Sequence, residues 1–154
     1  MIAQSVVKKL TKKKATLSVA ESITGGGLAS AITEISGSSK VFVGGVIAYE
    51  DSVKISELKV DAKTLKKFTA VSEEVAKEMA LGALKKFKTD YAIATTGVAG
   101  PGKAYGQKAG TVWVAIASKK VVFAIALSLS GSRDLIRHAT IESALASFER
   151  ILKP

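Results

Sequence analysis

The spacing of apolar and polar residues predicts a chain in which helices and strands largely alternate. Ile2, Val6 and Leu10 recur at helical spacing, so residues 2–13 are expected to form an amphipathic helix that ends in a lysine triplet. A short apolar, β-prone run over residues 15–20 predicts the first strand. The same reasoning predicts further helices at 28–35, 50–58, 59–68, 72–87 and 132–152, and further strands at 41–49, 90–96, 111–118 and 121–129. Ser72 and Ser132 are expected to cap the last two of these helices.

The connections between these elements predict the fold. Helical segments separate the first three strands, as expected for parallel neighbours with right-handed crossovers. Lys119 and Lys120 leave room only for a tight hairpin between the last two strands, which must be antiparallel. The segment 41–49 is nearly all apolar, so we expect a buried strand in which Gly44 and Gly45 mark a bulge or a close backbone approach. The prediction is a single α/β domain over residues 1–154, a three-layer α/β/α sandwich with a mixed, mostly parallel five-stranded sheet.

Composition narrows the chemistry and the location. The chain has 154 residues, is 47% hydrophobic, and has neither an apolar run long enough to span a bilayer nor a recognisable signal peptide. We therefore expect a cytoplasmic protein with no membrane partner. There is no cysteine, which excludes disulfides, thiolate nucleophiles and sulfur-ligated metal sites. His138 is the only histidine. No metal and no cofactor is expected.

The charge balance raises the question of partners. The formal net charge is +10, from 23 Lys and Arg against 13 Asp and Glu, which suggests nucleic acid as a partner. The lysines, however, stand in short pairs and triplets at expected helix ends, with few aromatic residues between them, so a solvated surface is the better interpretation. A basic field also attracts a phosphorylated small molecule. The apolar final helix and Phe42-Val43 leave room for a homo-oligomer.

A strand, a tight turn and a helix start follow one another in the stretch Ser18 to Gly27. Ser22 is expected at the carboxyl end of the strand, where open α/β sheets place their ligands. Thr24 is expected to cap the helix, and the bare backbone of Gly25 to Gly27 can bring N–H groups close to an oxyanion or a phosphate. The alternative is an ordinary capped turn softened by glycine.

Two further strand ends carry polar residues and are expected at the same edge of the sheet. One holds Tyr49 and Lys54, and the other is Thr96 with its following loop, Gly97 to Gly102. A serine can be activated by a neutral lysine, because desolvation lowers a lysine pKa by several units. Ser22 and Lys54 are therefore the predicted pair, with Tyr49 holding one of them or relaying a proton.

Six segments in order resemble one protein family: SVAESITGGGLAS, GGVIAYEDSVKISEL, AVSEEVAKEMALGAL, TTGVAGP, GTVWVAI and GSRDLIRHAT. They are similar to the C-terminal domain of the CinA family, the competence/damage-inducible proteins, a domain that also occurs alone as nicotinamide-nucleotide amidase. The resemblance implies hydrolysis of the carboxamide of nicotinamide mononucleotide, without a cofactor, by a stand-alone domain of this family.

The resemblance also assigns roles to individual positions. It makes Ser22 the nucleophile, with Tyr49, Lys54 and Thr96 as the other catalytic residues, and places the family's motif arginine on Arg133. Because Arg133 stands near a helix start and can bind a phosphate through two N–H groups, we expect it on the substrate phosphate. The remaining substrate-binding positions implied are Thr24, Gly25, Gly26, Gly97 and Gly100.

Two departures from the family pattern leave a second function open. Glu50 and Asp51 place two carboxylates before Lys54, where they can keep the lysine charged and weaken it as a base. The loop over 102–110 reads GKAYGQKAG, where a longer loop is usual. The alternative function is a non-catalytic nucleotide-binding or interaction module of the same fold.

Overall fold

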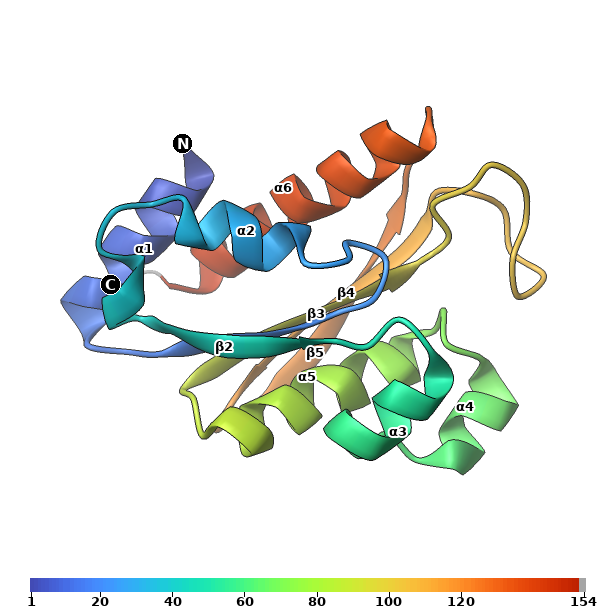
Figure 1. Ribbon diagram of the computed structural model, residues 1–154, viewed down its shortest axis with the longest axis horizontal. Helices are drawn as coiled ribbons and strands as arrows, with labels where there is room; N and C mark the ends of the chain where they lie inside the picture. The colour runs from blue at the N-terminus through green and yellow to red at the C-terminus, as the bar shows by residue number, and fades with distance from the viewer. Residues whose placement is uncertain (153–154) are drawn as a thin grey trace.

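The computed structural model describes residues 1–152, which fold into one α/β domain (Figure 1). The predicted order of helices and strands is confirmed, with ends shifted by a few residues, and a short 3-10 helix, η1, is added after α2. In chain order the elements are α1 (Ile2–Lys13), β1 (Leu17–Glu21), α2 (Gly27–Thr33), η1 (Ser38–Lys40), β2 (Phe42–Ile47), α3 (Asp51–Leu58), α4 (Ala62–Phe68), α5 (Glu73–Phe87), β3 (Tyr91–Gly97), β4 (Thr111–Ser118), β5 (Val122–Ser128) and α6 (Arg133–Ile151).

The five strands form one mixed sheet in the order β2-β1-β3-β4-β5. β1 pairs in parallel with both β2 and β3, whereas the β3–β4 and β4–β5 pairs are antiparallel. The expectation of a mostly parallel sheet was therefore wrong. The physical reason is the connection over residues 98–110, which contains no helix and returns the chain directly alongside β3.

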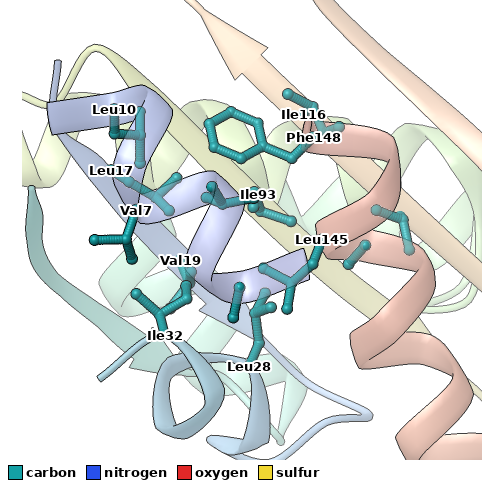
Figure 2. Close-up of a cluster of buried hydrophobic side chains, with 14 of the residues drawn as sticks. Val7, Leu10, Leu17, Val19, Leu28, Ile32, Ile93, Ile116, Leu145 and Phe148 are labelled. Atoms are coloured by element: carbon teal, nitrogen blue, oxygen red, sulfur yellow. The ribbon is translucent and has the colours of Figure 1, made fainter. Parts of the chain in front are cut away.

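Helices cover both faces of this sheet, which confirms the three layers. Figure 1 shows α1, α2 and α6 over one face and α3, α4 and α5 over the other. The first face is packed with large aliphatic side chains, and Figure 2 shows Leu17, Val19 and Ile93 of the sheet meeting the helices there. The second face carries small side chains, so α5 can approach the strands closely; these are Ala20, Ala92, Ala94, Ala115 and Ala117.

β2 differs from the buried strand that its apolar sequence predicted. It lies at the edge of the sheet, and its residues alternate between partly and largely exposed, including Val43 and Ile47. Its glycines do mark both a bulge and a close approach. The register with β1 shifts between Leu17 and Ser18, and a Cβ on Gly45 would lie only 2.6 Å from the carbonyl oxygen of Val19. Apolar composition alone could not separate an edge strand from a central one.

Two of the predicted helix caps are confirmed. Ser72 accepts a hydrogen bond from the N–H of Val75 at the start of α5, and Ser132 accepts one from the N–H of Leu135 at the start of α6. These caps fix where α5 and α6 begin. Within residues 1–152, no helix is both long enough and apolar enough to cross a bilayer.

Candidate active site

A cavity of about 250 Å³ lies at the carboxyl ends of β1 and β3, beside the segment that follows β2. Ser22, Tyr49, Thr96 and Arg133 all line it, together with the loop over 97–105. The three polar strand ends therefore meet, as predicted. They meet because β1 has both β2 and β3 as parallel neighbours, so all three chains leave the sheet at one edge.

Lys54 projects from the first turn of α3 into the interior beneath this cavity and is fully buried. Its Nζ lies 3.2 Å from Oγ of Ser22, 2.8 Å from the carbonyl oxygen of Ala48 and 3.1 Å from that of Tyr49. Nζ is placed to donate to all three oxygens. A protonated lysine has three N–H donors and fills all three contacts, whereas a neutral lysine donates to the two carbonyls and turns its lone pair to the Ser22 hydroxyl.

Two opposing influences set the pKa of Lys54. Burial is the larger one and lowers the pKa, because the charged amine loses its hydration. The charge of Asp51, whose Oδ1 lies 3.9 Å from Nζ and whose side chain is about half exposed, raises it. The net direction is downward from the ordinary lysine value. The Asp51 carboxylate therefore reduces the downward shift in the Lys54 pKa, which suits Lys54 to act as a general base, but does not reverse it.

Tyr49 and Arg133 lie at the mouth of the cavity and contact each other. Arg133, the first residue of α6, donates from Nη1 to the carbonyl oxygen of Gly100 at 2.6 Å and from Nη2 to the Tyr49 hydroxyl at 3.4 Å. These contacts hold the guanidinium over the loop that follows β3. Tyr49 itself is 61% exposed, so its ring faces the opening and not the core.

Thr96 shapes the wall of the cavity. Its Oγ1 donates to the carbonyl oxygen of Ala70 at 2.7 Å, which ties the end of β3 to the segment before α5. Gly97 and Gly100 follow in the lining. A Cβ on Gly97 would lie 2.8 Å from the carbonyl oxygen of Thr111, so the backbone there requires glycine.

The glycine turn after Ser22 serves a different purpose from the one predicted. Thr24, Gly25 and Gly26 do not line the cavity. The N–H of Gly25 bonds to the carbonyl of Ser22, that of Gly27 to the carbonyl of Thr24, and that of Gly26 to a carboxylate. The expectation that these amides are free to hold an oxyanion or a phosphate is therefore not supported.

The carboxylate that takes this position is Glu21, which sequence reasoning missed. It is 1% exposed and accepts from the hydroxyl of Thr24 and from the N–H groups of Gly26, Leu28 and Ala29. Glu21, and not Thr24 as predicted, therefore caps α2; the N-cap position itself is Gly26, which has no capping side chain. A glutamate at the end of a buried strand, immediately before a helix, was the available signal, because helix N-termini favour negative charge.

Two other residues near the site were also missed. Arg137 of α6 donates to the carbonyl oxygens of Ile23 and Thr24 at 3.2 and 3.1 Å, so it holds the turn that carries Ser22. Tyr105 lines the cavity from the loop between β3 and β4. Arg137 lies one helical turn after Arg133 on the same helix, so helical spacing could have identified it. Tyr105 lies in a loop, where no periodicity in the sequence would reveal it.

The acidic side chains near the cavity are dispersed. Glu21 is fully engaged with α2, and Asp51 stands next to Lys54. Across residues 1–152 no three His, Cys, Asp or Glu side chains lie close enough together to hold a metal ion. His138 is exposed on α6, with Nε2 3.7 Å from Asp134 and away from the cavity lining.

Fold and site together define an α/β domain that buries a serine–lysine pair at the carboxyl edge of a mixed sheet. The sequence matches the CinA C-terminal domain over residues 1–152, so the chain belongs to this family. Among curated relatives, a CinA-like protein of Flavobacterium psychrophilum is 44% identical over 148 residues, covering 95% of this chain and 35% of that protein. A competence-damage inducible protein of Thermoanaerobacter sp., named as putative, is 45% identical, covering 96% of this chain and 36% of that protein.

Solved structures of similar proteins share the whole fold. The competence/damage inducible protein CihA from Agrobacterium tumefaciens is 35% identical with a TM-score of 0.94, and the match covers 99% of this chain and 94% of that one. A CinA superfamily protein from Klebsiella pneumoniae is 32% identical with a TM-score of 0.96, covering 98% and 95%. The chain thus spans about a third of the length of the curated relatives quoted above but nearly all of these solved chains.

Proposed function

We propose that this protein is an amidohydrolase that converts the carboxamide of nicotinamide mononucleotide into a carboxylate and releases ammonia. The observation that carries the proposal is the contact between Nζ of Lys54 and Oγ of Ser22, 3.2 Å apart beside the cavity. A buried amine with a lowered pKa, in hydrogen-bond contact with a cavity-facing hydroxyl, is the arrangement that activates a serine nucleophile.

The proposed reaction has two halves. Ser22 Oγ attacks the carboxamide carbon while its proton passes to Nζ of Lys54. The resulting ammonium returns that proton to the amide nitrogen, the C–N bond breaks, ammonia leaves, and an ester with Ser22 remains. Water then attacks the ester, Lys54 takes a proton from the water and delivers it to the serine oxygen, and the carboxylate product is released.

Stabilisation of the tetrahedral oxyanion needs backbone donors other than the glycines of the turn. The N–H groups of Ile23, Ala99 and Gly100 belong to residues that line the cavity, and they make no hydrogen bond to any other group in residues 1–152. We assign the oxyanion to this set. Removal of one such donor typically costs about 10²- to 10³-fold in rate.

The rest of the cavity suits a mononucleotide. Its volume of about 250 Å³ lies below the 300–1,000 Å³ of most drug-sized ligand pockets, which favours one ring with its attached sugar and phosphate over a dinucleotide. Arg133 and Lys103, both in the lining, supply positive charge for the phosphate.

The test is ammonia release from nicotinamide mononucleotide by the purified chain. Ser22→Ala and Lys54→Met are each expected to lower kcat by about 10³-fold or more, since members of such a pair act as one unit. Ser56→Ala, an exposed serine on the same helix as Lys54, serves as the matched control and should retain full activity. No ammonia from the unaltered protein, or full turnover by Ser22→Ala, would contradict the proposal. Binding without turnover would instead indicate a nucleotide-binding module.

A further inference from the structure

Tyr105 stands at the tip of a small hairpin within the loop between β3 and β4. Ala104 and Gln107 form an antiparallel bridge with reciprocal backbone hydrogen bonds of 3.0 and 2.9 Å. Tyr105 and Gly106 between them both have positive φ, 54° and 71°, as in the two-residue type I′ turn. Gln107 Nε2 also donates to the carbonyl oxygen of Val71 at 2.8 Å, so the hairpin is tied to the cavity wall.

The tyrosine occupies an unfavourable backbone position for its type. Asn, Asp and Gly are the residues that adopt positive φ at low cost, whereas a bulky residue there is uncommon. The ring is not packed in the core, because the side chain is 51% exposed. Neither local backbone preference nor packing in the core therefore accounts for an aromatic residue at this tip.

Tyr105 instead lines the cavity together with Tyr49. Both tyrosines line it, Tyr49 from the segment after β2 and Tyr105 from the loop that projects past the ends of the parallel strands (Figure 1). Burial is the main cause that raises the pKa of Tyr105, and the charges of Asp51 and Tyr49 raise it further.

We infer that Tyr105 and Tyr49 form an aromatic clamp that selects a positively charged planar ring, the N-ribosylated pyridinium of the substrate. This inference rests on the proposed function. Tyrosine rings attract cations through their electron-rich faces. The carboxylate of Asp51, whose Oδ1 lies 3.9 Å from Nζ of Lys54, adds attraction for a cationic ring in a chain whose net charge of +10 otherwise repels one.

Equilibrium binding in a Ser22→Ala background tests the clamp without turnover. Tyr105→Asn is the decisive variant, because Asn-Gly is the preferred sequence of a type I′ turn and should preserve the hairpin while it removes the ring. Calorimetry with nicotinamide mononucleotide should show Kd about tenfold higher for Tyr105→Asn and nearly unchanged for Tyr105→Phe. The reduced dihydronicotinamide mononucleotide, whose ring is uncharged, should lose much less affinity on the same substitution.

The possible outcomes separate the clamp from the proposed function. Equal affinity of Tyr105→Asn and the parent protein for the charged nucleotide, or equal losses for the charged and reduced rings, would overturn the clamp alone. No binding of the charged nucleotide by the Ser22→Ala protein would overturn both. A thermal midpoint for Tyr105→Asn at or above that of the parent protein is expected, and it excludes unfolding of the loop as the cause of lost affinity.

Discussion

The Nζ atom of Lys54 lies 3.2 Å from Oγ of Ser22, and its other two hydrogen-bond partners are backbone carbonyls. A fully buried lysine in this position makes the stability of the protein depend on pH. Its pKa in the folded protein lies below the ordinary lysine value of 10.5, so the two states bind different numbers of protons between those two values. This dependence provides a test of the site that needs no substrate.

The first prediction concerns that pH dependence. Between the folded pKa of Lys54 and 10.5 the unfolded chain holds a proton that the native state has lost, so the free energy of unfolding rises with pH. Below the folded pKa both states are protonated and the native state carries the full cost of the buried charge. Urea titrations from pH 7 to pH 10 should show the parent protein gaining stability relative to Lys54→Met as pH rises. A difference that stays constant or falls would contradict a lowered pKa.

The second prediction concerns the pH dependence of kcat/KM. Lys54 must be neutral to accept the proton of Ser22, so activity is expected to rise with pH through the Lys54 pKa. Asp51→Asn removes the carboxylate charge that raises this pKa, so the acidic limb of the profile should move to lower pH. Glu50→Gln is the matched control. It removes the other neighbouring carboxylate but keeps the backbone carbonyl of Glu50, which accepts the hydrogen bonds that start α3. A limb unmoved by Asp51→Asn would show that another group controls it.

Periodicity in the sequence was sufficient to predict the elements, the two serine caps and the convergence of polar strand ends. These features depend on contacts within a helix or on the order of helices and strands along the chain, both of which can be seen in the sequence. The edge position of β2 and the antiparallel β3–β4 pair were missed because they depend on how the whole sheet assembles.

In the candidate site, too, some features could be predicted from local sequence and others depended on tertiary packing. Ser22 and Lys54 were found as a pair because each follows a predicted strand end, and the 3.2 Å contact between them agrees with that expectation. The roles of the turn glycines were misjudged, because no local sequence pattern showed that the Glu21 carboxylate would accept hydrogen bonds from the N–H groups at the start of α2. That contact forms only when the strand and the helix are packed together.

The third prediction concerns Glu21. Glu21→Gln keeps the shape of the side chain but removes the charge that faces the N-terminus of α2, and it leaves a buried amide among N–H donors. Loss of charge-assisted hydrogen bonds in a buried site should lower the free energy of unfolding by about 2 kcal/mol. Denaturant titration provides the measurement, and Glu34→Gln, an exposed glutamate after the same helix, should change it by less than about 0.5 kcal/mol. Equal stability of the two variants would show that Glu21 does not stabilise α2.

The fourth prediction concerns Arg137, which we propose as a positioning residue. Its guanidinium bonds to the carbonyls of Ile23 and Thr24, so Arg137→Ala should let the turn that carries Ser22 shift. Because small misplacements of a reacting group cost up to about 10²-fold in rate, kcat should fall by about tenfold or more while KM changes little. Arg137→Lys, which can still donate to a carbonyl, should recover part of kcat, and Arg150→Ala at the exposed end of α6 should leave it unchanged. A purely structural role would instead lower the thermal midpoint and leave kcat at low temperature intact.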